Sequence, residues 1–261
     1  MNLEMYFSTT IRFLIALACM AMLGLPAAAI VGGARQSRIT GQPIAMILGA
    51  RGNDSILCTG TALARDLLLT AAHCVAPGTR LQIMLSATSK MAPIGAVAQH
   101  PRFDTQSYAR GRVTADVALI KLAAPLPEYV APVALAAAGE SVAVGDRLRI
   151  AGFGVTVQGK NAITGVAHIA TLVVTGRPGN LQIRLVDPAT LGERAGLGAC
   201  IGDSGGPVFR EADGRIRVLG VISWSTGPAD EEGCGGMTGV TPLTLYRAWV
   251  VEQAAKMGSP L

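Results

Sequence analysis

The stretch Gly202-Asp203-Ser204-Gly205-Gly206-Pro207 carries the strongest chemical pattern in this sequence. A serine hydroxyl is a weak nucleophile, so it needs a neighbouring base to take its proton and donors for the oxyanion that its attack creates. Glycines on both sides of Ser204 let the backbone turn sharply and bring two N–H groups toward one point. The stretch therefore predicts a catalytic serine.

The positions of the histidines along the chain separate two kinds of serine hydrolase. Read as Gly-x-Ser-x-Gly, the segment around Ser204 also fits the nucleophile elbow of α/β-hydrolases, whose triad runs serine, acid, histidine. The chain has only His73, His100 and His168, and none of them follows Ser204. The chain order therefore excludes the α/β-hydrolase arrangement.

His73 is the predicted base. It lies in the segment Thr70-Ala-Ala-His-Cys74, after an apolar run and beside a cysteine whose disulfide would fix the backbone. A lone histidine is usually a hydrogen-bonded structural residue, and that interpretation suits His100, which precedes a proline, and His168, which begins an apolar run. No two histidines have the spacing of metal ligands.

Asp116 is the predicted acid. It opens the apolar run Asp116-Val-Ala-Leu-Ile120, where a buried carboxylate is costly unless it is paired. Asp104 lies in a polar stretch and is predicted to be solvated instead. The order His73, Asp116, Ser204 is that of chymotrypsin, whereas subtilisin runs Asp, His, Ser.

Composition and hydrophobic pattern predict an all-β fold. Half of the 261 residues are hydrophobic and 15% are charged, which is typical of a globular chain rather than a disordered one. Short apolar runs of about four to eight residues recur between Gly, Pro, Asp and Asn, which indicates a β-sandwich or barrel. The runs begin at Leu67, Leu81, Val117, Leu148, His168, Leu181 and Val218.

The last segment has a helical period instead. Residues 242–256 predict one amphipathic C-terminal helix with Thr241 as its N-cap. A stretch rich in Pro and Ala, residues 125–145, is predicted to separate two β units at residues 30–140 and 141–261. The apolar face of the helix is predicted to consist of Leu243, Tyr246, Val250 and Ala254.

Residues 1–29 predict a secretory signal peptide. Arg12 precedes the apolar run Phe13–Leu25, and Ala27–Ala29 offers the small residues that a signal peptidase needs. The run is too short to span a bilayer, which takes about 20 residues. Its removal also removes Cys19 and leaves four cysteines, which predicts two disulfides with three possible pairings. We therefore expect a secreted or periplasmic protein.

Six short segments, each present once, are distributed over nearly all of the chain after residue 29. They are Ile30-Val-Gly-Gly33, Thr70-Ala-Ala-His-Cys74, Asp116-Val-Ala-Leu119, Ala151-Gly-Phe-Gly154, Gly202-Asp-Ser-Gly-Gly-Pro207 and Ser223-Trp224. With these segments in this order, the chain resembles the chymotrypsin/trypsin family of serine proteases.

The resemblance implies a fold and an active site. The fold would be all-β, with two six-stranded antiparallel β-barrels, the active site in the crevice between them, and a C-terminal α-helix. The catalytic triad would be His73, Asp116 and Ser204, and the N–H groups of Gly202 and Ser204 would form the oxyanion hole. Ser223 would support Asp116.

The resemblance also implies the disulfides and the mode of substrate binding. It pairs Cys58 with Cys74 and Cys200 with Cys234. It places Ser223, Trp224 and Ser225 where they bind the substrate backbone as an added strand.

Activation in this family uses a new N-terminal amine that pairs with the Asp before the nucleophile, here Asp203. The predicted signal cleavage after Ala29 falls directly before Ile30. We therefore expect export itself to create the active N-terminus. The alternative is cleavage one or two residues earlier, which would leave a short propeptide for another protease.

The specificity pocket departs from that of trypsin. Gly198, six residues before Ser204, stands where trypsin-like enzymes have an Asp, and Ala199 adds no charge to the floor. Ser225 and Gly239 are the predicted walls, so we expect a preference for small or medium apolar side chains. Apolar pockets discriminate weakly, by roughly 1–3 kcal/mol per methylene, so the specificity should be broad. The acidic run 230–232 is interpreted as a solvated loop.

The sequence therefore predicts a serine endopeptidase that acts on protein or peptide substrates, without cofactor or metal and as a monomer. A non-catalytic homologue that acts as a binding protein and an esterase-type acyl hydrolase remain as alternatives. The net charge of +5 comes from scattered residues, which does not favour nucleic-acid binding, and no membrane association is expected after signal cleavage.

Overall fold

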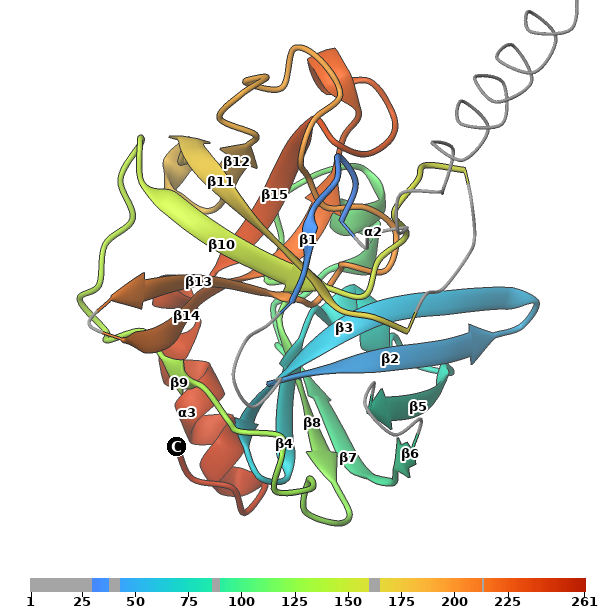
Figure 1. Ribbon diagram of the computed structural model, residues 1–261. Helices are drawn as coiled ribbons and strands as arrows, with labels where there is room; N and C mark the ends of the chain where they lie inside the picture. Colours follow the sequence, from blue (N-terminus) through green and yellow to red (C-terminus); the bar gives the residue numbers. More distant parts are fainter. Residues whose placement is uncertain (1–29, 38–42, 86–89, 160–164, 213) are drawn as a thin grey trace, which may run out of the picture.

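Two strongly curled β-sheets form most of the molecule and lie one above the other in Figure 1. The predicted signal peptide and Cys19 lie outside the residues that the structure describes. None of the helices in the described part of the chain is long and apolar enough to cross a membrane. The structure, a computed structural model, describes residues 30–37, 43–85, 90–159, 165–212 and 214–261.

The first sheet curls until its two edge strands are consecutive in the chain. Its order is β6-β5-β2-β3-β4-β8-β7, and only Pro93 separates β6 from β7. Proline has no N–H for a β ladder, which explains the break at this position. When β6 and β7 are counted as one strand bent at Pro93, the sheet is a six-stranded half-barrel, which is called the first barrel below. Its strands are β2 (Ile44–Arg51), β3 (Asp54–Ala64), β4 (Leu67–Thr70), β5 (Arg80–Leu85), β6 (Lys90–Ala92), β7 (Ile94–Gln99) and β8 (Ala118–Leu122).

The second sheet closes on itself. Its strands follow one another in the order β11-β10-β13-β14-β15-β12, and β12 pairs back onto β11. Two short strands extend this barrel: β1 (Arg35–Gln36) pairs with β11, and β9 (Ala134–Leu135) runs parallel to β14. The barrel strands are β10 (Arg147–Gly152), β11 (His168–Gly176), β12 (Ile183–Val186), β13 (Pro207–Ala212), β14 (Arg215–Ser225) and β15 (Met237–Pro242).

The two sheets confirm the predicted fold class. Each of the seven apolar runs contains a strand, in chain order β4, β5, β8, β10, β11, β12 and β14. The remaining helical segments are short. They are α2 (Thr105–Ala109) and 3₁₀ turns at Ala72–Val75, Pro178–Asn180, Pro228–Asp230 and Leu243–Leu245.

The C-terminal helix forms as predicted, but its start is different. The four predicted apolar residues are all buried, and they pack into the core of the first barrel. Figure 1 shows the C-terminal helix beside that barrel. The helix α3 spans Arg247–Lys256 and follows a 3₁₀ turn. Thr241 is not its N-cap, because its backbone pairs with Val221 in the ladder between β15 and β14. The β ladder extends through Pro242 and delays the helix.

The first and the last described segments each pack on the barrel that is farther away in the sequence. The segment containing β1 joins the second barrel, although it precedes the first in sequence, and α3 packs on the first barrel. A third hydrophobic cluster fills the space between the barrels, where Ile44 and Met46 of β2 meet Phe153, Ile169 and Phe209. The boundary near residue 140 remains a prediction.

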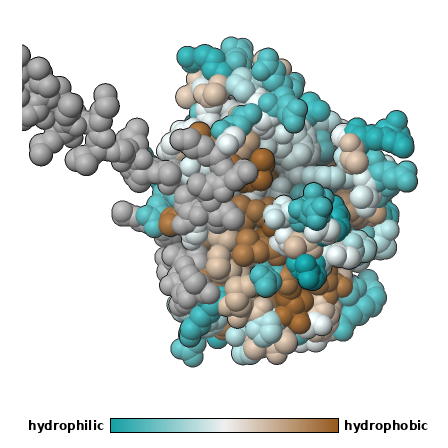
Figure 2. Space-filling view, turned by 90° about the vertical axis from the view of Figure 1, so that its right-hand side faces the viewer, coloured by the Kyte–Doolittle hydropathy of each residue, from teal (hydrophilic) through white to brown (hydrophobic). Residues whose placement is uncertain are grey.

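The surface is not uniformly polar. Figure 2 shows hydrophobic side chains gathered in the middle of one face, with hydrophilic side chains around its rim. More than half of the accessible surface of a soluble protein is usually apolar, so this area alone assigns no function.

Candidate active site

His73 and Asp116 lie next to two paired strands of the first barrel. The 3₁₀ turn that carries His73 follows β4, and Asp116 stands two residues before β8, with which β4 pairs through Thr70 and Ala118. His73 Nδ1 lies 2.8 Å from Asp116 Oδ2, and the His73 backbone N–H donates to Asp116 Oδ1 at 2.9 Å. Two contacts to one carboxylate fix both the ring and its backbone, which orients Nε2 away from Asp116.

Asp116 is fully buried and receives a further donor from the second barrel. The Ser223 hydroxyl of β14 donates to Asp116 Oδ2. The side chain of His73 is 19% exposed, so the pair lies at the edge of the interior. A buried carboxylate needs such donors to remain charged. The burial and the three donors make Asp116 a suitable orienting group for an imidazole.

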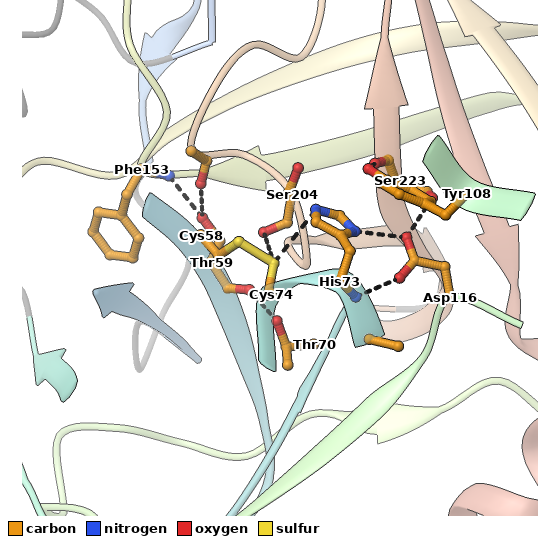
Figure 3. Close-up of a disulfide and its surroundings, with 12 residues drawn as sticks. Cys58, Thr59, Thr70, His73, Cys74, Tyr108, Asp116, Phe153, Ser204 and Ser223 are labelled. Carbon is orange, nitrogen blue, oxygen red and sulfur yellow. Dashed lines mark hydrogen bonds and ion pairs between the residues drawn. A yellow bond between two sulfur atoms is a disulfide. The ribbon is translucent and has the colours of Figure 1, made fainter. Parts of the chain in front are cut away.

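Tyr108, on α2, covers this pair. Its ring stacks on the His73 ring with 4.6 Å between centroids and 14° between planes, and its hydroxyl donates to the Ser223 carbonyl at 2.9 Å. Figure 3 shows Tyr108 and Ser223 together beside Asp116. Burial, with the charge of Asp116, raises the pKa of the Tyr108 hydroxyl well above its usual range. The hydroxyl therefore remains a hydrogen-bond donor.

Ser204 lies in the loop before β13, close to His73. Cys74 Sγ is 3.6 Å from His73 Nε2 and 3.7 Å from the Ser204 carbonyl oxygen, so the disulfide lies beside both residues (Figure 3). The hydrogen bonds of the described residues do not include one between the Ser204 hydroxyl and His73. Such bonds are often long in free enzymes and tighten when substrate binds.

The backbone around Ser204 presents two free donors. Within the described residues, the N–H groups of Gly202 and Ser204 have no hydrogen-bond partner, whereas the Asp203 N–H between them donates to Cys200 O at 3.0 Å. Gly202 has a φ of 98°, and an added Cβ would lie 2.6 Å from Leu57 Cδ2. The turn therefore requires glycine, and it leaves two N–H groups for a ligand oxygen.

Thr59 of β3 fixes this loop from the first barrel. Its N–H donates to the Ser204 carbonyl at 2.7 Å, and its hydroxyl donates to the Gly202 carbonyl at 2.8 Å. The same hydroxyl accepts from the Phe153 N–H at 3.1 Å (Figure 3). Thr59 thus links the nucleophile loop to β3 and to the residues after β10.

Both implied disulfides form. Cys58 and Cys74 join β3 to the 3₁₀ turn of His73, with Cα atoms 6.2 Å apart. Cys200 and Cys234 join the nucleophile loop to the segment before β15, with Cα atoms 4.9 Å apart. Cys58, His73 and Cys74 lie close enough to share a metal, but the disulfide removes both thiolate ligands.

Asp203 is a second buried carboxylate, fully inside the second barrel. It accepts from the Gly154 N–H at 2.8 Å and from the Cys200 N–H at 2.9 Å. No ion pair of the described residues includes Asp203, and burial raises the pKa of its carboxyl to about 7. An added Cβ at Gly152 would lie 2.2 Å from Asp203 Oδ1, so this wall must be glycine.

Ile30 is buried in the same barrel, with a strained backbone. Its exposed fraction is 0%, and its φ of 61° is a genuine outlier for a β-branched residue. The next residue, Val31, forms an antiparallel bridge with Gly198. The start of the described chain thus lies against the predicted pocket floor.

The predicted pocket residues do not all come together. Gly198 lies against Gly235, where an added Cβ would be 2.9 Å from Gly235 Cα, and the Ala199 N–H donates to the Thr238 hydroxyl at 3.0 Å. Ser225 pairs with Thr238 across β14 and β15. Gly239 is on the other face of β15. A Cβ there would lie 1.9 Å from Trp224 Cε2, so Gly239 accommodates the indole rather than facing Ala199.

The other two histidines, Asp104 and the acidic run 230–232 lie outside the site, as predicted from the sequence. His100 is buried, its Nδ1 accepts from the Arg102 N–H at 3.1 Å, and burial lowers its pKa. His168 is also buried, its Nδ1 lies 3.0 Å from Val166 O, and burial lowers its pKa too. Asp104 is exposed and caps α2, and the acidic run 230–232 is exposed.

Three residues of this site were not predicted from the sequence. Tyr108 is an aromatic residue in a polar segment before Asp116, and that mismatch is the one signal that could have pointed to it. Thr59 and Thr238 carry no such signal, because their roles depend on contacts with residues far along the chain.

The comparisons with known proteins agree with this geometry. The sequence profile described as Trypsin matches residues 30–250. Snake venom serine protease rhinocerase 4 from Bitis rhinoceros is 26% identical over 231 residues, which cover 85% of this chain and 86% of the relative. The family match covers most of the chain, and the two-barrel fold fits it. The chain therefore belongs to the trypsin family and is a serine-type endopeptidase.

Proposed function

We propose that the protein hydrolyses peptide bonds with Ser204 as nucleophile, His73 as general base and Asp116 as the group that orients His73. His73 Nε2 takes the hydroxyl proton while Ser204 Oγ attacks the carbonyl carbon. The proton then passes to the leaving amine as the C–N bond breaks, which leaves an acyl-enzyme that water hydrolyses by the same steps. The observation that carries this proposal is the buried contact of Asp116 with His73 Nδ1.

The N–H groups of Gly202 and Ser204 would bind the oxyanion of each tetrahedral intermediate. Their lack of a partner within the described residues supports this role. Donors that are fixed before the reaction need no reorganisation when charge develops, and the loss of one such donor typically lowers kcat by about 10²–10³-fold.

Activation would follow from signal cleavage directly before Ile30. The new amine could pair with Asp203, and the cut would remove the peptide bond that defines the strained φ of Ile30. We therefore propose residues 1–29 as a signal peptide and a secreted or periplasmic location. N-terminal sequencing of freshly exported Ser204→Ala protein should give Ile30 as the first residue. A first residue of Ala28 or Ala29 would contradict activation by signal cleavage alone.

The specificity pocket would accept small or medium apolar side chains. Gly198 and Ala199 supply no charge at its floor, and Thr238 adds only a hydroxyl that already accepts from the Ala199 N–H. Ser223, Trp224 and Ser225 would pair with the substrate backbone. Cleavage of a mixed peptide pool should show no strong preference for Arg or Lys at the cleaved bond.

A fluorophosphonate probe tests the nucleophile. It should label the mature wild-type protein and not the Ser204→Ala variant, and a wild-type protein that stays unlabelled would indicate a non-catalytic binding homologue.

Matched peptide and ester substrates then separate an endopeptidase from an acyl hydrolase. An enzyme that cleaves the esters and none of the peptides would contradict the proposed substrate class. The protein is expected to act as a monomer, which light scattering would check.

A further inference from the structure

A groove of about 500 Å³ lies beside the candidate active site. Its lining includes Tyr108, Ser223 and Trp224, of which Tyr108 stacks on His73. Arg112 and Arg184 also line it, and no acidic residue is among its described lining residues. A volume in this range is typical of sites for small ligands or side chains. The groove therefore adjoins the residue that stacks on His73 and carries two arginine side chains.

The strand register places Arg184 on the same face of the second barrel as Trp224. Gly176, Arg184, Gly239 and Trp224 lie side by side on β11, β12, β15 and β14. Residues directly opposite each other in antiparallel strands share a face of the sheet. The Trp224 indole covers Gly239, where a Cβ would be 1.9 Å away. On the other side of Arg184, Gly176 has no side chain of its own, and a Cβ there would lie 3.9 Å from Arg184 Cδ. The Arg184 side chain therefore lies on the same face as the Trp224 indole, with glycine as its neighbour on both strands.

Arg184 has no partner for its charge within the described residues. Its side chain is partly buried, and its Nε is buried without a hydrogen-bond partner. Two other arginines of the second barrel do have partners, Arg149 with Glu211 and Arg210 with Glu140 and Asp146, whereas Arg147, Arg215 and Arg217 belong to no ion pair of the described residues. What distinguishes Arg184 is its buried Nε. A buried donor without an acceptor costs free energy. Arg184 thus holds a buried donor for which the described residues supply no acceptor.

Arg112 adds a second charge at the rim. It is exposed and belongs to no ion pair of the described residues, and its backbone N–H donates to Ser107 O at 2.8 Å. This bond ties the residue to α2, which also carries Tyr108. The planar guanidinium of arginine matches a carboxylate with two parallel hydrogen bonds.

We propose that this groove binds an acidic side chain of the substrate at a position near, but not at, the cleaved bond. The inference rests on the proposed function and names its substrate class: peptides that combine a small apolar residue at the cleaved bond with a Glu or Asp close by. Arg184 is the main ligand of that carboxylate, and Arg112 strengthens the attraction from the rim.

The test is a peptide series in which Glu and Gln alternate at each position around one cleavable bond. The wild-type enzyme should cleave the Glu peptide about 5- to 30-fold better in kcat/KM at one or two positions, as expected for one charge-assisted hydrogen-bonded contact. Arg184→Gln should abolish that ratio by lowering kcat/KM for the Glu peptide. Arg112→Gln should lower the ratio by less, and Arg184→Glu should favour Lys over Gln at the same position.

Arg80→Gln serves as the matched control, because Arg80 is an exposed arginine of β5 in the first barrel. It changes the net charge equally and should leave the Glu-to-Gln ratio as in the wild type. Equal rates on Glu and Gln peptides at every position, or the same loss of ratio in Arg80→Gln, would overturn the proposal.

Binding to the Ser204→Ala variant keeps the test independent of catalysis. Fluorescence anisotropy should show tighter binding of the Glu peptide, and the difference should disappear in Ser204→Ala, Arg184→Gln. If the wild type cleaves neutral peptides but shows no ratio, the groove proposal fails and the protease proposal stands. If fluorophosphonate labelling fails while the Glu peptide still binds more tightly than the Gln peptide, the protease proposal fails and the groove proposal stands.

Discussion

The two buried carboxylates of the site, Asp116 and Asp203, differ in what surrounds them. Both have an exposed fraction of 0%. Asp116 accepts from the His73 ring, the His73 backbone and the Ser223 hydroxyl. Asp203 accepts from two backbone N–H groups and has no ion pair within the described residues, and burial raises the pKa of its carboxyl to about 7.

The difference shows how each partner is supplied. The partner of Asp116 comes with folding, because β4 and β8 bring His73 and Asp116 together. In the proposed activation, the partner of Asp203 would be made by cutting the chain, since Ile30 has no amine charge while Ala29 is attached. Substitutions at either carboxylate test this difference.

The largest effect is expected for Asp116→Asn. Asparagine has a similar shape but its amide favours the wrong imidazole tautomer, and this change in related proteases lowers kcat about 10⁴-fold. Steady-state kinetics on the preferred peptide measure the loss. His100→Gln is the matched control on a structural histidine and should keep kcat. A loss below about tenfold in Asp116→Asn would rule out Asp116 as the orienting acid.

Asp203→Asn should have the next largest effect, and only in the mature protein. Breaking one buried ion pair costs about 3–5 kcal/mol. Part of this cost should destabilise the loop that holds the N–H groups of Gly202 and Ser204 in position. We expect kcat/KM to fall roughly 10²–10³-fold. Full activity of the mature variant would mean that Asp203 needs no cationic partner.

In the precursor, which retains the residues before Ile30, the stability of the fold should depend on pH through Asp203. The Asp203 carboxyl has a pKa of about 7 in the fold against 3.8 for the free group, so the folded chain binds more protons between these values. The free energy of unfolding should therefore fall as pH rises from about 4 to 7, by up to about 4 kcal/mol. Urea unfolding of Ser204→Ala protein that retains the residues before Ile30 measures it.

Asp203→Asn in that precursor is the control, because it removes the titrating group and should flatten this part of the profile. The mature chain should lack the fall, since its Ile30 amine would favour the charged carboxylate. Identical slopes for the precursor and for its Asp203→Asn variant would show that another group causes the pH dependence.

The sequence predicted the parts of this comparison that consist of contiguous segments. His73, Asp116 and Ser204 each lie in a short motif, and the short apolar runs predicted the strands that carry them. The pocket was less predictable, because side chains alternate between the faces of a strand. A shift of one residue therefore exchanges Thr238, which contacts Ala199, for Gly239, which lies under Trp224.

Tyr108 was unpredictable for a different physical reason. Its contact with His73 depends on how α2 folds between Arg102 and Thr114, through the Asp104 cap and the bond from the Asp104 N–H to Thr114 Oγ1 at 2.7 Å. No periodic pattern encodes such a loop. Thr241 shows the same limit at the C-terminal helix, where a β ladder took precedence over a suitable N-cap residue.

The smallest effect is expected for Tyr108→Phe, which removes only the Tyr108 hydroxyl from the surroundings of Asp116. The phenyl ring keeps its stacking on His73, but the Ser223 carbonyl loses its hydroxyl donor. One net hydrogen bond contributes about 1 kcal/mol, so kcat/KM should fall less than about tenfold and thermal unfolding should shift slightly. Tyr108→Ala also loses the stacking and should cost more. Equal losses in the two variants would show that the hydroxyl, and not the ring, positions His73.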